Sequence, residues 1–259
     1  MSSGYAEVNG LRLYYEIHGE GRPLVLLHGA FSGIRSSFGV YLPELAKSHR
    51  VIGLEMQGHA HTADVARPLR VPSMAADTIA ALEQLGVEQA DLFGYSLGAG
   101  VAFQVALDRP DLVRKIVLMS LSFDNSGFHP GALEGLAQLQ AEWLVGSNWH
   151  QEYMSTAPDP AAFPQLVEKI KDLNANLPQW TDDEVRSLQP PALVLSGDSD
   201  IVPEHLVRFF RLLGGGISGD TPAGLPRSRL GVLPATAHTM MVDRAELLLP
   251  MLRDFLDSD

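Results

Sequence analysis

A serine lies between two glycines in the segment Gly94-Tyr95-Ser96-Leu97-Gly98, where a predicted buried strand meets a predicted helix. A sharp turn there lifts the Ser96 hydroxyl out of the sheet, and Gly94 and Gly98 leave room for strand and helix to approach. The hydroxyl then lies at a helix N-terminus, whose free N–H groups favour a developing negative charge. This pattern indicates a serine nucleophile that performs acyl transfer.

A serine needs a general base, and the base needs an acid that orients it. His238 follows the last predicted strand and precedes the final helix, at the sheet edge where catalytic loops gather. An isolated loop histidine is more often an ordinary surface residue, but this position and its order after Ser96 favour a base. We therefore predict that His238 accepts the Ser96 proton.

Two carboxylates compete for the role of the acid, because both follow the buried strand that ends near Leu195. Asp200 lies three residues beyond Gly197 and can turn back towards a neighbouring loop, whereas Asp198 is expected to stabilise the turn. Asp124, which follows another predicted strand, ranks third. We predict that Asp200 orients His238.

Acyl transfer also needs N–H donors for the oxyanion. One donor is expected from Leu97, the residue after the serine. The second is expected from the loop that begins at His28, through the N–H of Ala30, or of Phe31 if the loop is shifted by one residue. Both alternatives stay open. His28 itself is predicted to be structural.

Short apolar runs and helical segments alternate along the chain and must position these side chains. Eight strands are predicted: Tyr5–Val8, Leu11–Ile17, Leu24–Leu27, Val51–Leu54, Ala90–Phe93, Ile116–Met119, Ala192–Leu195 and Arg229–Leu233. Helices are predicted at Ser36–Lys47, Ser73–Leu85, Leu97–Asp108, Pro203–Leu213 and Met240–Leu256. The alternation predicts an α/β fold, with a mostly parallel sheet and helices on both faces. Asn9-Gly10 predicts an antiparallel hairpin at the start.

Residues 125–189 break this alternation, because they contain helix-like pieces at Gly131–Leu144 and Phe163–Leu173 but no convincing strand. We interpret them as a small helical cap over a core of residues 1–124 and 190–259. Their aromatic side chains either line a substrate pocket or form the core of the cap. Our predicted substrate contacts are Phe31, Tyr95, Phe123 and Trp143, of which Phe31 and Tyr95 lie next to the chemistry.

The composition narrows the range of partners. The 259 residues include 31 acidic and 19 basic side chains, a formal charge of −12, and no cysteine. Such acidity repels phosphate backbones, and the lack of cysteine excludes thiolate nucleophiles and iron–sulfur sites. Apolar runs are far shorter than the about 20 residues that span a bilayer, and no signal-peptide pattern is visible. We expect a cytoplasmic enzyme with neither nucleic acid nor membrane as a partner, and a homodimer stays open.

Two other motifs were weighed as ligand sites. His59, His61 and Asp64 are metal-ligand side chains, but their spacing does not match a metallohydrolase and no later histidine cluster completes the set. Gly214-Gly215-Gly216 follows a helix and lacks the Lys-Ser/Thr of a phosphate loop. The sequence therefore implies no metal and no nucleotide cofactor.

The motif set resembles that of the α/β-hydrolase superfamily, and in particular compact bacterial esterase-like serine hydrolases with a helical cap. The motifs are His28-Gly29-Ala30-Phe31, Gly58-His59, Gly94 to Gly98, Gly197 to Asp200, and His238. The resemblance implies a Ser–Asp–His triad in that chain order, which Ser96, Asp200 and His238 fill. Ala60 and Ala99 stand where similar proteins often have glycine.

The expected reaction is cleavage of a small carboxylic ester through an acyl-enzyme. Asp-nucleophile chemistry on halides or epoxides does not fit Ser96. Two alternatives stay open. The same triad can act on another bond, as in lactone, amide, carbamate or carbon–carbon hydrolysis and in cofactor-free perhydrolysis. The fold can also serve as a ligand receptor with little turnover, which an intact triad disfavours.

Overall fold

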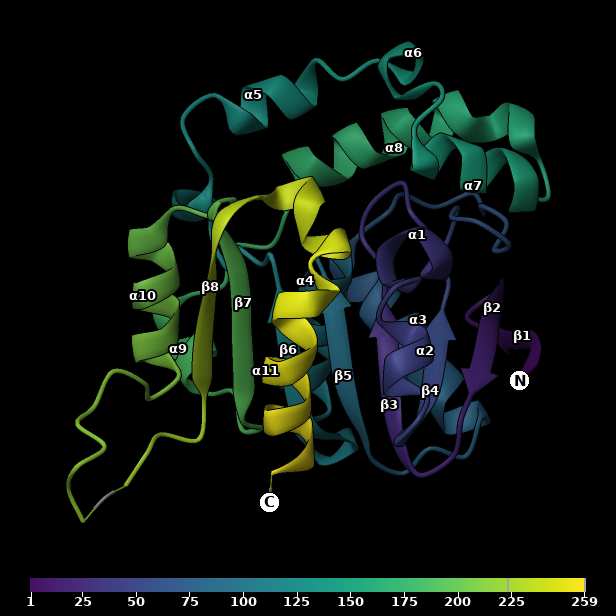
Figure 1. The fold of residues 1–259 in the computed structure, drawn as a ribbon. Helices are drawn as coiled ribbons and strands as arrows, with labels where there is room; N and C mark the ends of the chain where they lie inside the picture. The colour runs from purple at the N-terminus through teal and green to yellow at the C-terminus, as the bar shows by residue number, and fades with distance from the viewer. Residues whose placement is uncertain (223, 259) are drawn as a thin grey trace.

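The computed structural model describes residues 1–222 and 224–258, so Ala223 and Asp259 of the predicted core segment lie outside the described residues. An eight-stranded sheet forms its centre, in the order β1-β2-β4-β3-β5-β6-β7-β8 (Figure 1). The strands are β1 (Ser2–Val8), β2 (Leu11–His18), β3 (Arg22–Leu27), β4 (His49–Leu54), β5 (Ala90–Tyr95), β6 (Val113–Met119), β7 (Ala192–Ser199) and β8 (Arg229–Ala237). The β1–β2 and β2–β4 pairs are antiparallel and the other neighbours are parallel. The predicted α/β fold is therefore confirmed.

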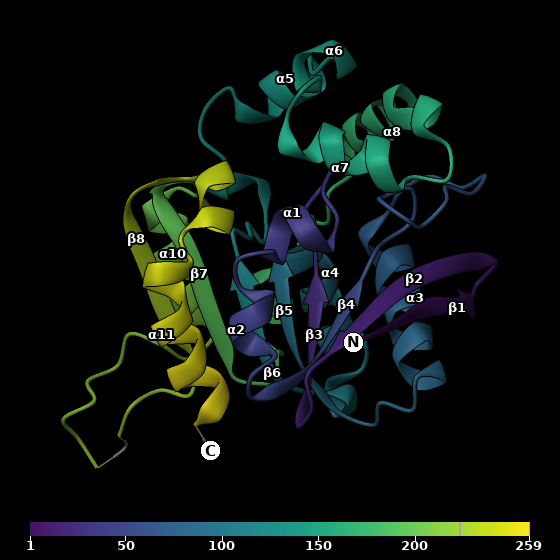
Figure 2. The same ribbon diagram turned by 45° about the vertical axis from the view of Figure 1, so that its right-hand side comes forward.

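Helices connect the strands and cover both faces of the sheet (Figures 1 and 2). Those outside residues 125–189 are α1 (Ile34–Phe38), α2 (Leu42–Leu45), α3 (Val71–Gln84), α4 (Leu97–Asp108), η1 (Pro110–Leu112), α10 (Pro203–Leu212), η4 (His238–Asp243) and α11 (Ala245–Asp257). Those inside it are η2 (Asn125–Gly127), α5 (Ala132–Ala137), α6 (Ala141–Leu144), α7 (Asn148–Thr156), η3 (Pro160–Ala162), α8 (Phe163–Ala175) and α9 (Asp182–Arg186).

The two layers of the core follow from the alternation of side chains along the buried strands. In β3, Leu24 and Leu26 pack with α1, α2 and α11 on one face of the sheet. Val25 and Leu27 pack with α3, α4 and α10 on the other face. Both faces are buried, which explains why the sequence of this strand is continuously apolar.

The N-terminal hairpin turns as its sequence predicts. Asn9 and Gly10 join β1 to β2 with backbone φ angles of 50° and 77°. Positive φ at both central residues is the signature of the tight turn that matches strand twist. The predicted antiparallel start of the sheet is therefore present.

The predicted helix at 36–47 is wrong as a single element. The chain forms α1 and α2 instead, and Pro43 lies in the first turn of α2. Between them, Tyr41 is fully buried and its hydroxyl donates to the carbonyl of Met241, 2.5 Å away. Burial of Tyr41 thus bends the chain where periodicity alone indicates a continuous helix. In the same way, the predicted 131–144 helix divides into α5 and α6, and the final helix is preceded by the separate turn η4.

In the segment 125–189, which we call the cap segment, helices α5 to α8 lie above the carboxyl ends of the central strands, at the top of Figure 1, whereas α9 lies beside α10. It joins β6 to β7 and contains only helices and loops. The division of the chain into core and cap stays a prediction. Within the described residues, every helix falls short of the length and hydropathy that a membrane span requires.

Candidate active site

Ser96 sits in a strained turn between β5 and α4. Its backbone φ is 53°, a conformation that costs energy for a residue with a side chain. Its N–H donates to the carbonyl of Met119 at the end of β6, at 2.8 Å. Glycines make the turn feasible, because a Cβ at Gly94 would lie 2.3 Å from the Gly98 oxygen, and one at Gly98 would lie 1.9 Å from the Leu27 oxygen.

The structure brings the three predicted triad residues into one hydrogen-bonded chain. His238 Nδ1 lies 2.7 Å from Asp200 Oδ1, and His238 Nε2 lies 2.9 Å from Ser96 Oγ. A carboxylate only accepts hydrogen bonds, so the proton of the neutral imidazole belongs on Nδ1 and Ser96 donates to Nε2. This is the arrangement in which a histidine can receive the proton of a serine.

Asp200 is suited to hold the imidazole in that orientation. Its side chain is 1% exposed, and its second oxygen accepts from the Ser196 hydroxyl at 3.1 Å. Burial raises the pKa of the Asp200 carboxyl, but the hydrogen bond and charge of His238 outweigh it, so the net pKa lies below its usual value. Asp200 therefore remains ionised where His238 needs a partner.

The two competing carboxylates lie elsewhere. Asp198 is exposed and accepts from the backbone N–H groups of Ala235 and Thr236, at 2.9 and 3.1 Å, so it fixes the end of β8. Asp124 accepts from Arg208 Nη1 at 2.7 Å. Neither carboxylate is bonded to His238, which leaves Asp200 as the candidate acid.

The predicted oxyanion donors flank the serine. Leu97 is the first residue of α4, and Ala30 and Phe31 line the same cavity as Ser96. Phe31 has a φ of 64°, so the loop turns sharply at this point. Both Ala30 and Phe31 stay candidates for the second donor.

His28 anchors the start of this loop. Its Nε2 accepts from the Met56 N–H at 2.9 Å, and its Nδ1 donates to the Gly29 carbonyl at 2.8 Å. Burial, aided by the nearby His59, lowers the pKa of His28 to about 3, so the ring is neutral at ordinary pH. These contacts are structural, as the sequence predicts.

A cavity of about 500 Å³ opens over Ser96 and His238. The core contributes the triad residues, and the cap segment contributes most of the apolar lining. The apolar lining from the cap segment consists of Phe128, Ala132, Leu136, Leu139, Leu144, Trp149, Ile170, Leu173, Leu177, Pro178 and Trp180. The size and the mixture of apolar walls and a few polar groups are those of a small-molecule site.

Two of the four predicted substrate contacts line this cavity. Phe31 and Tyr95 do so, and the Tyr95 hydroxyl donates to the His238 carbonyl at 3.0 Å. Phe123 does not, because it is fully buried against His205 and Phe209 of α10.

Trp143 does not line the cavity either. It is 66% exposed on the outside of α6, a helix of only four residues with Leu144 as its single buried side chain. The structure therefore places Phe123 and Trp143 outside the lining of this cavity.

The sequence interpretation did not single out Ser120 and Glu152. Ser120 directly follows β6 with a φ of 62°, and its hydroxyl is buried. Ser120 lines the cavity, and a hydrogen bond from its side chain helps to lower the pKa of the Asp200 carboxyl. A clue was visible in the sequence, because Ser120 follows a buried strand just as Ser96 does.

Glu152 joins the cap segment to the oxyanion loop. Its buried carboxylate accepts from the N–H groups of Gly33, Arg35 and Ser36, at 2.9, 3.1 and 3.2 Å. These groups begin α1, directly after the loop that carries Ala30. A negative charge at a helix N-terminus is favourable, so Glu152 holds α7 and the start of α1 together.

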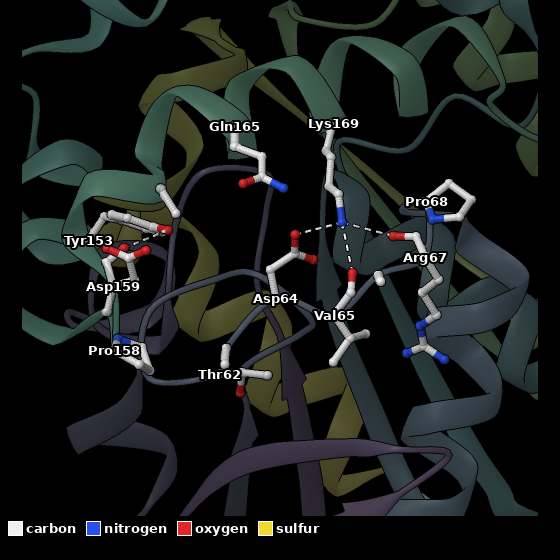
Figure 3. Close-up of a pocket in the computed structure, with 14 residues that line it drawn as sticks. Thr62, Asp64, Val65, Arg67, Pro68, Tyr153, Pro158, Asp159, Gln165 and Lys169 are labelled. Atoms are coloured by element: carbon white, nitrogen blue, oxygen red, sulfur yellow. Dashed lines mark hydrogen bonds and ion pairs between the residues drawn. The ribbon is translucent and has the colours of Figure 1, made fainter.

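A second cavity, of about 540 Å³, lies between the 62–68 loop and helices α7 and α8 (Figure 3). Lys169 extends into it and pairs with Asp64 at 2.6 Å. The same ammonium group also donates to the carbonyls of Val65 and Arg67, each at 2.9 Å. The charges of this cavity therefore tie α8 to the loop below it.

Comparison with known proteins agrees with this geometry. The sequence model of the alpha/beta hydrolase fold family matches residues 22–209. A curated relative, the 2-hydroxymuconate semialdehyde hydrolase of Pseudomonas sp. (strain CF600), is 26% identical over 278 residues, which cover 95% of this chain and 91% of the relative.

Solved structures with the same fold include two bacterial enzymes. The enol-lactonase from Burkholderia xenovorans LB400 has a TM-score of 0.72 and 18% identity, and the match covers 98% of this chain and 100% of that chain. A carboxylesterase from Bacillus subtilis has a TM-score of 0.71 and 19% identity, with 98% and 91% covered. Since the family model spans well over half of the sequence, the chain belongs to the α/β-hydrolase fold family, a family of hydrolytic enzymes.

Proposed function

We propose that this protein is a serine hydrolase that cleaves carboxylic esters through an acyl-enzyme intermediate. The supporting observation is the continuous chain from Ser96 Oγ to His238 to Asp200 at the floor of a largely apolar cavity. The family match supports hydrolysis as the class of reaction. An ester is the simplest substrate for this set of groups, because an alkoxide is a better leaving group than the amide anion of an amine and the one proton on His238 is enough to release it.

The first half of the reaction forms the acyl-enzyme. Ser96 Oγ attacks the ester carbonyl carbon while its proton passes to His238 Nε2. The N–H of Leu97 and that of Ala30 or Phe31 stabilise the oxyanion, each contributing about 3 kcal/mol. The tetrahedral species then collapses, and the alcohol leaves with the proton from His238.

The second half returns the enzyme to its starting state. A water molecule gives a proton to His238 Nε2 and its oxygen attacks the acyl carbon. The carboxylic acid leaves, and Ser96 recovers its proton from His238. Asp200 stabilises the imidazolium in both halves and keeps the ring oriented.

The test combines turnover with labelling of the serine. We expect the wild type to hydrolyse a series of p-nitrophenyl esters and to be labelled by a fluorophosphonate on Ser96. Ser96→Ala should lose both properties while it keeps its fold, and Ser187→Ala, at an exposed serine of α9's end, should keep both. Retained turnover in Ser96→Ala, or a label on another serine, would contradict the proposal.

A further inference from the structure

The cavity over Ser96 has two chemically different walls. Near the core, its polar side chains include the triad, Ser120, Ser122, Asp124 and Thr239. The opposite wall comes from the cap segment and is mostly apolar: Ile170 and Leu173 of α8 are almost fully buried, and Asn174 of the same helix is a polar exception. A substrate that reaches Ser96 must therefore place part of itself against hydrocarbon.

The position of His238 indicates which part of an ester packs against the apolar wall. The leaving alcohol has to receive a proton from His238 Nε2, and the His238 side chain is 42% exposed. This exposure favours a pose with the alcohol at the open side of the site. In that pose the acyl group, which stays bonded to Ser96, extends towards the lining residues of α5 and α8.

The fixed charges around the cavity are negative. Its carboxylic acids are Asp124 and Asp200, and hydrogen bonding holds both as carboxylates despite partial burial. The guanidinium of Arg208 is already engaged, because it pairs with Asp124 at 2.7 Å and with Asp182 at 2.5 Å. It also lies over the Phe123 ring, 4.7 Å from its centre.

We propose that this site selects uncharged esters whose apolar acyl chain packs against α5 and α8, and that it rejects acyl chains that end in a carboxylate. The inference rests on the proposed ester hydrolysis at Ser96. An anionic chain end would lose its hydration on entering the apolar part of the cavity, and two nearby carboxylates would repel it. A methylene chain gains from the same burial, by about two- to fourfold in kcat/KM for each CH₂.

Three esters with one leaving group test this on the wild type. They are p-nitrophenyl hexanoate, the mono-p-nitrophenyl ester of adipic acid, and the methyl ester of that adipate. We expect kcat/KM for the adipate monoester to be at least about 100-fold below that for the hexanoate, and the neutral methyl ester to lie within about tenfold of the hexanoate. An adipate monoester that is hydrolysed within threefold of the hexanoate would overturn the inference.

Two variants on α8 separate charge from shape. Asn174 lines this cavity, whereas Gln165 lines the second cavity on the same helix. Asn174→Lys should raise kcat/KM for the adipate monoester at least about tenfold by supplying a counterion, and Gln165→Lys should leave both esters unchanged. An Asn174→Lys variant that hydrolyses the hexanoate normally, with no gain on the adipate, would contradict the inference.

The failure of this inference is distinguishable from that of the proposed function. If Ser96 is labelled and the hexanoate is hydrolysed, but the anionic ester is an equal substrate, only the selectivity is overturned. If no ester is hydrolysed and Ser96 is not labelled, the proposed function and this inference both fail. A poorly folded Asn174→Lys protein leaves the decision to the three esters on the wild type.

Discussion

Two cavities of similar size lie on either side of α8, about 500 Å³ over the triad and about 540 Å³ over the 62–68 loop. They differ in what their polar groups do. In the second cavity, Lys169 is bonded to Asp64 and to two backbone carbonyls. In the first, Ser96 and His238 form a proton path that Asp200 orients.

The difference teaches that volume alone does not identify the reactive site. Charges that satisfy each other fix two parts of the chain together, as Lys169 and Asp64 do for α8 and the loop (Figure 3). A serine that is hydrogen-bonded to a base and lies beside apolar walls can still react with a bound ligand. Substitutions in the first cavity should therefore change turnover, and those in the second should change stability.

The largest effect is expected from a pair of aspartates, one in each cavity. Asp200→Asn keeps the shape but removes the charge that orients and stabilises the His238 ring, so kcat should fall by at least about 10³-fold. Asp64→Asn should leave kcat within about twofold and lower the melting temperature, because Lys169 loses its partner. Steady-state kinetics and thermal unfolding of both variants check this prediction. Equal losses of kcat in the two variants would contradict the distinction between a catalytic and a structural cavity.

Acid should weaken the loops that wall the two cavities. His28 belongs to the oxyanion loop and His59 precedes the 62–68 loop, and their rings lie 5.0 Å apart. Burial lowers the pKa of His28 from 6.5 to about 3 and that of His59 from 6.5 to about 4. The unfolded chain therefore binds more protons between these values, so the free energy of unfolding is highest above pH 6.5 and falls as the pH drops towards 4.

His28 and His59 together take up about two protons on unfolding near pH 5, which corresponds to about a 100-fold change in the unfolding constant per pH unit. His205, whose pKa burial also lowers to about 4, adds to this slope. Urea unfolding between pH 4.5 and 8 measures that slope. His59→Gln should reduce it by about one proton, whereas His129→Gln, at an exposed position, should not. A His59→Gln slope equal to that of the wild type would contradict this origin of the acid sensitivity.

Glu152 should link the cap segment to turnover in the first cavity. Glu152→Gln replaces one accepting oxygen with an amide that opposes the N–H groups of Gly33 and Ser36, and so loosens the start of α1 behind the oxyanion loop. We expect kcat to fall about tenfold with KM little changed, since a misplaced oxyanion donor costs up to 10²–10³.

Matched variants test the role of Glu152. Glu168→Gln removes an exposed carboxylate of the same cap segment and should leave kcat unchanged. Glu152→Asp should restore part of the kcat, because it keeps the charge. If Glu152→Gln lowers the melting temperature but not kcat, its role is purely structural.

The smallest effect is expected on the apolar wall. Leu136 of α5 lines the first cavity, and Leu133 of the same helix does not. Leu136→Ala should raise KM for p-nitrophenyl hexanoate about three- to fivefold through lost apolar contact, with kcat within twofold. Leu133→Ala is the control, and an identical change in both variants would show that α5 does not contact the acyl chain.

Local sequence patterns were sufficient to predict the catalytic side of the site, which consists of the triad and the turn that carries Ser96. Gly94, Ser96 and Gly98 belong to one strand-turn-helix unit, so their roles in the turn follow from a few adjacent residues. Asp200 and His238 follow neighbouring parallel strands, and the sheet topology brings their loops together. The same reasoning predicted the hairpin at Asn9 and the order of strands and helices.

The cap segment and the side chains around it were less predictable, because their contacts join distant parts of the chain. Phe123 packs against Phe209, and Glu152 reaches a backbone N–H that lies 119 residues earlier. Short helices such as α6 carry too little periodicity to reveal that Trp143 faces outwards. These side chains are placed by tertiary packing, which no local pattern records.

The most direct test of the central claim is to trap the acyl-enzyme. Wild-type protein mixed with p-nitrophenyl hexanoate and quenched in acid during turnover should carry a hexanoyl group on the peptide that contains Ser96, as mass spectrometry of the digest can show. Rapid turnover with the acyl group on another residue, or the same adduct and turnover in Ser96→Ala, would contradict the account.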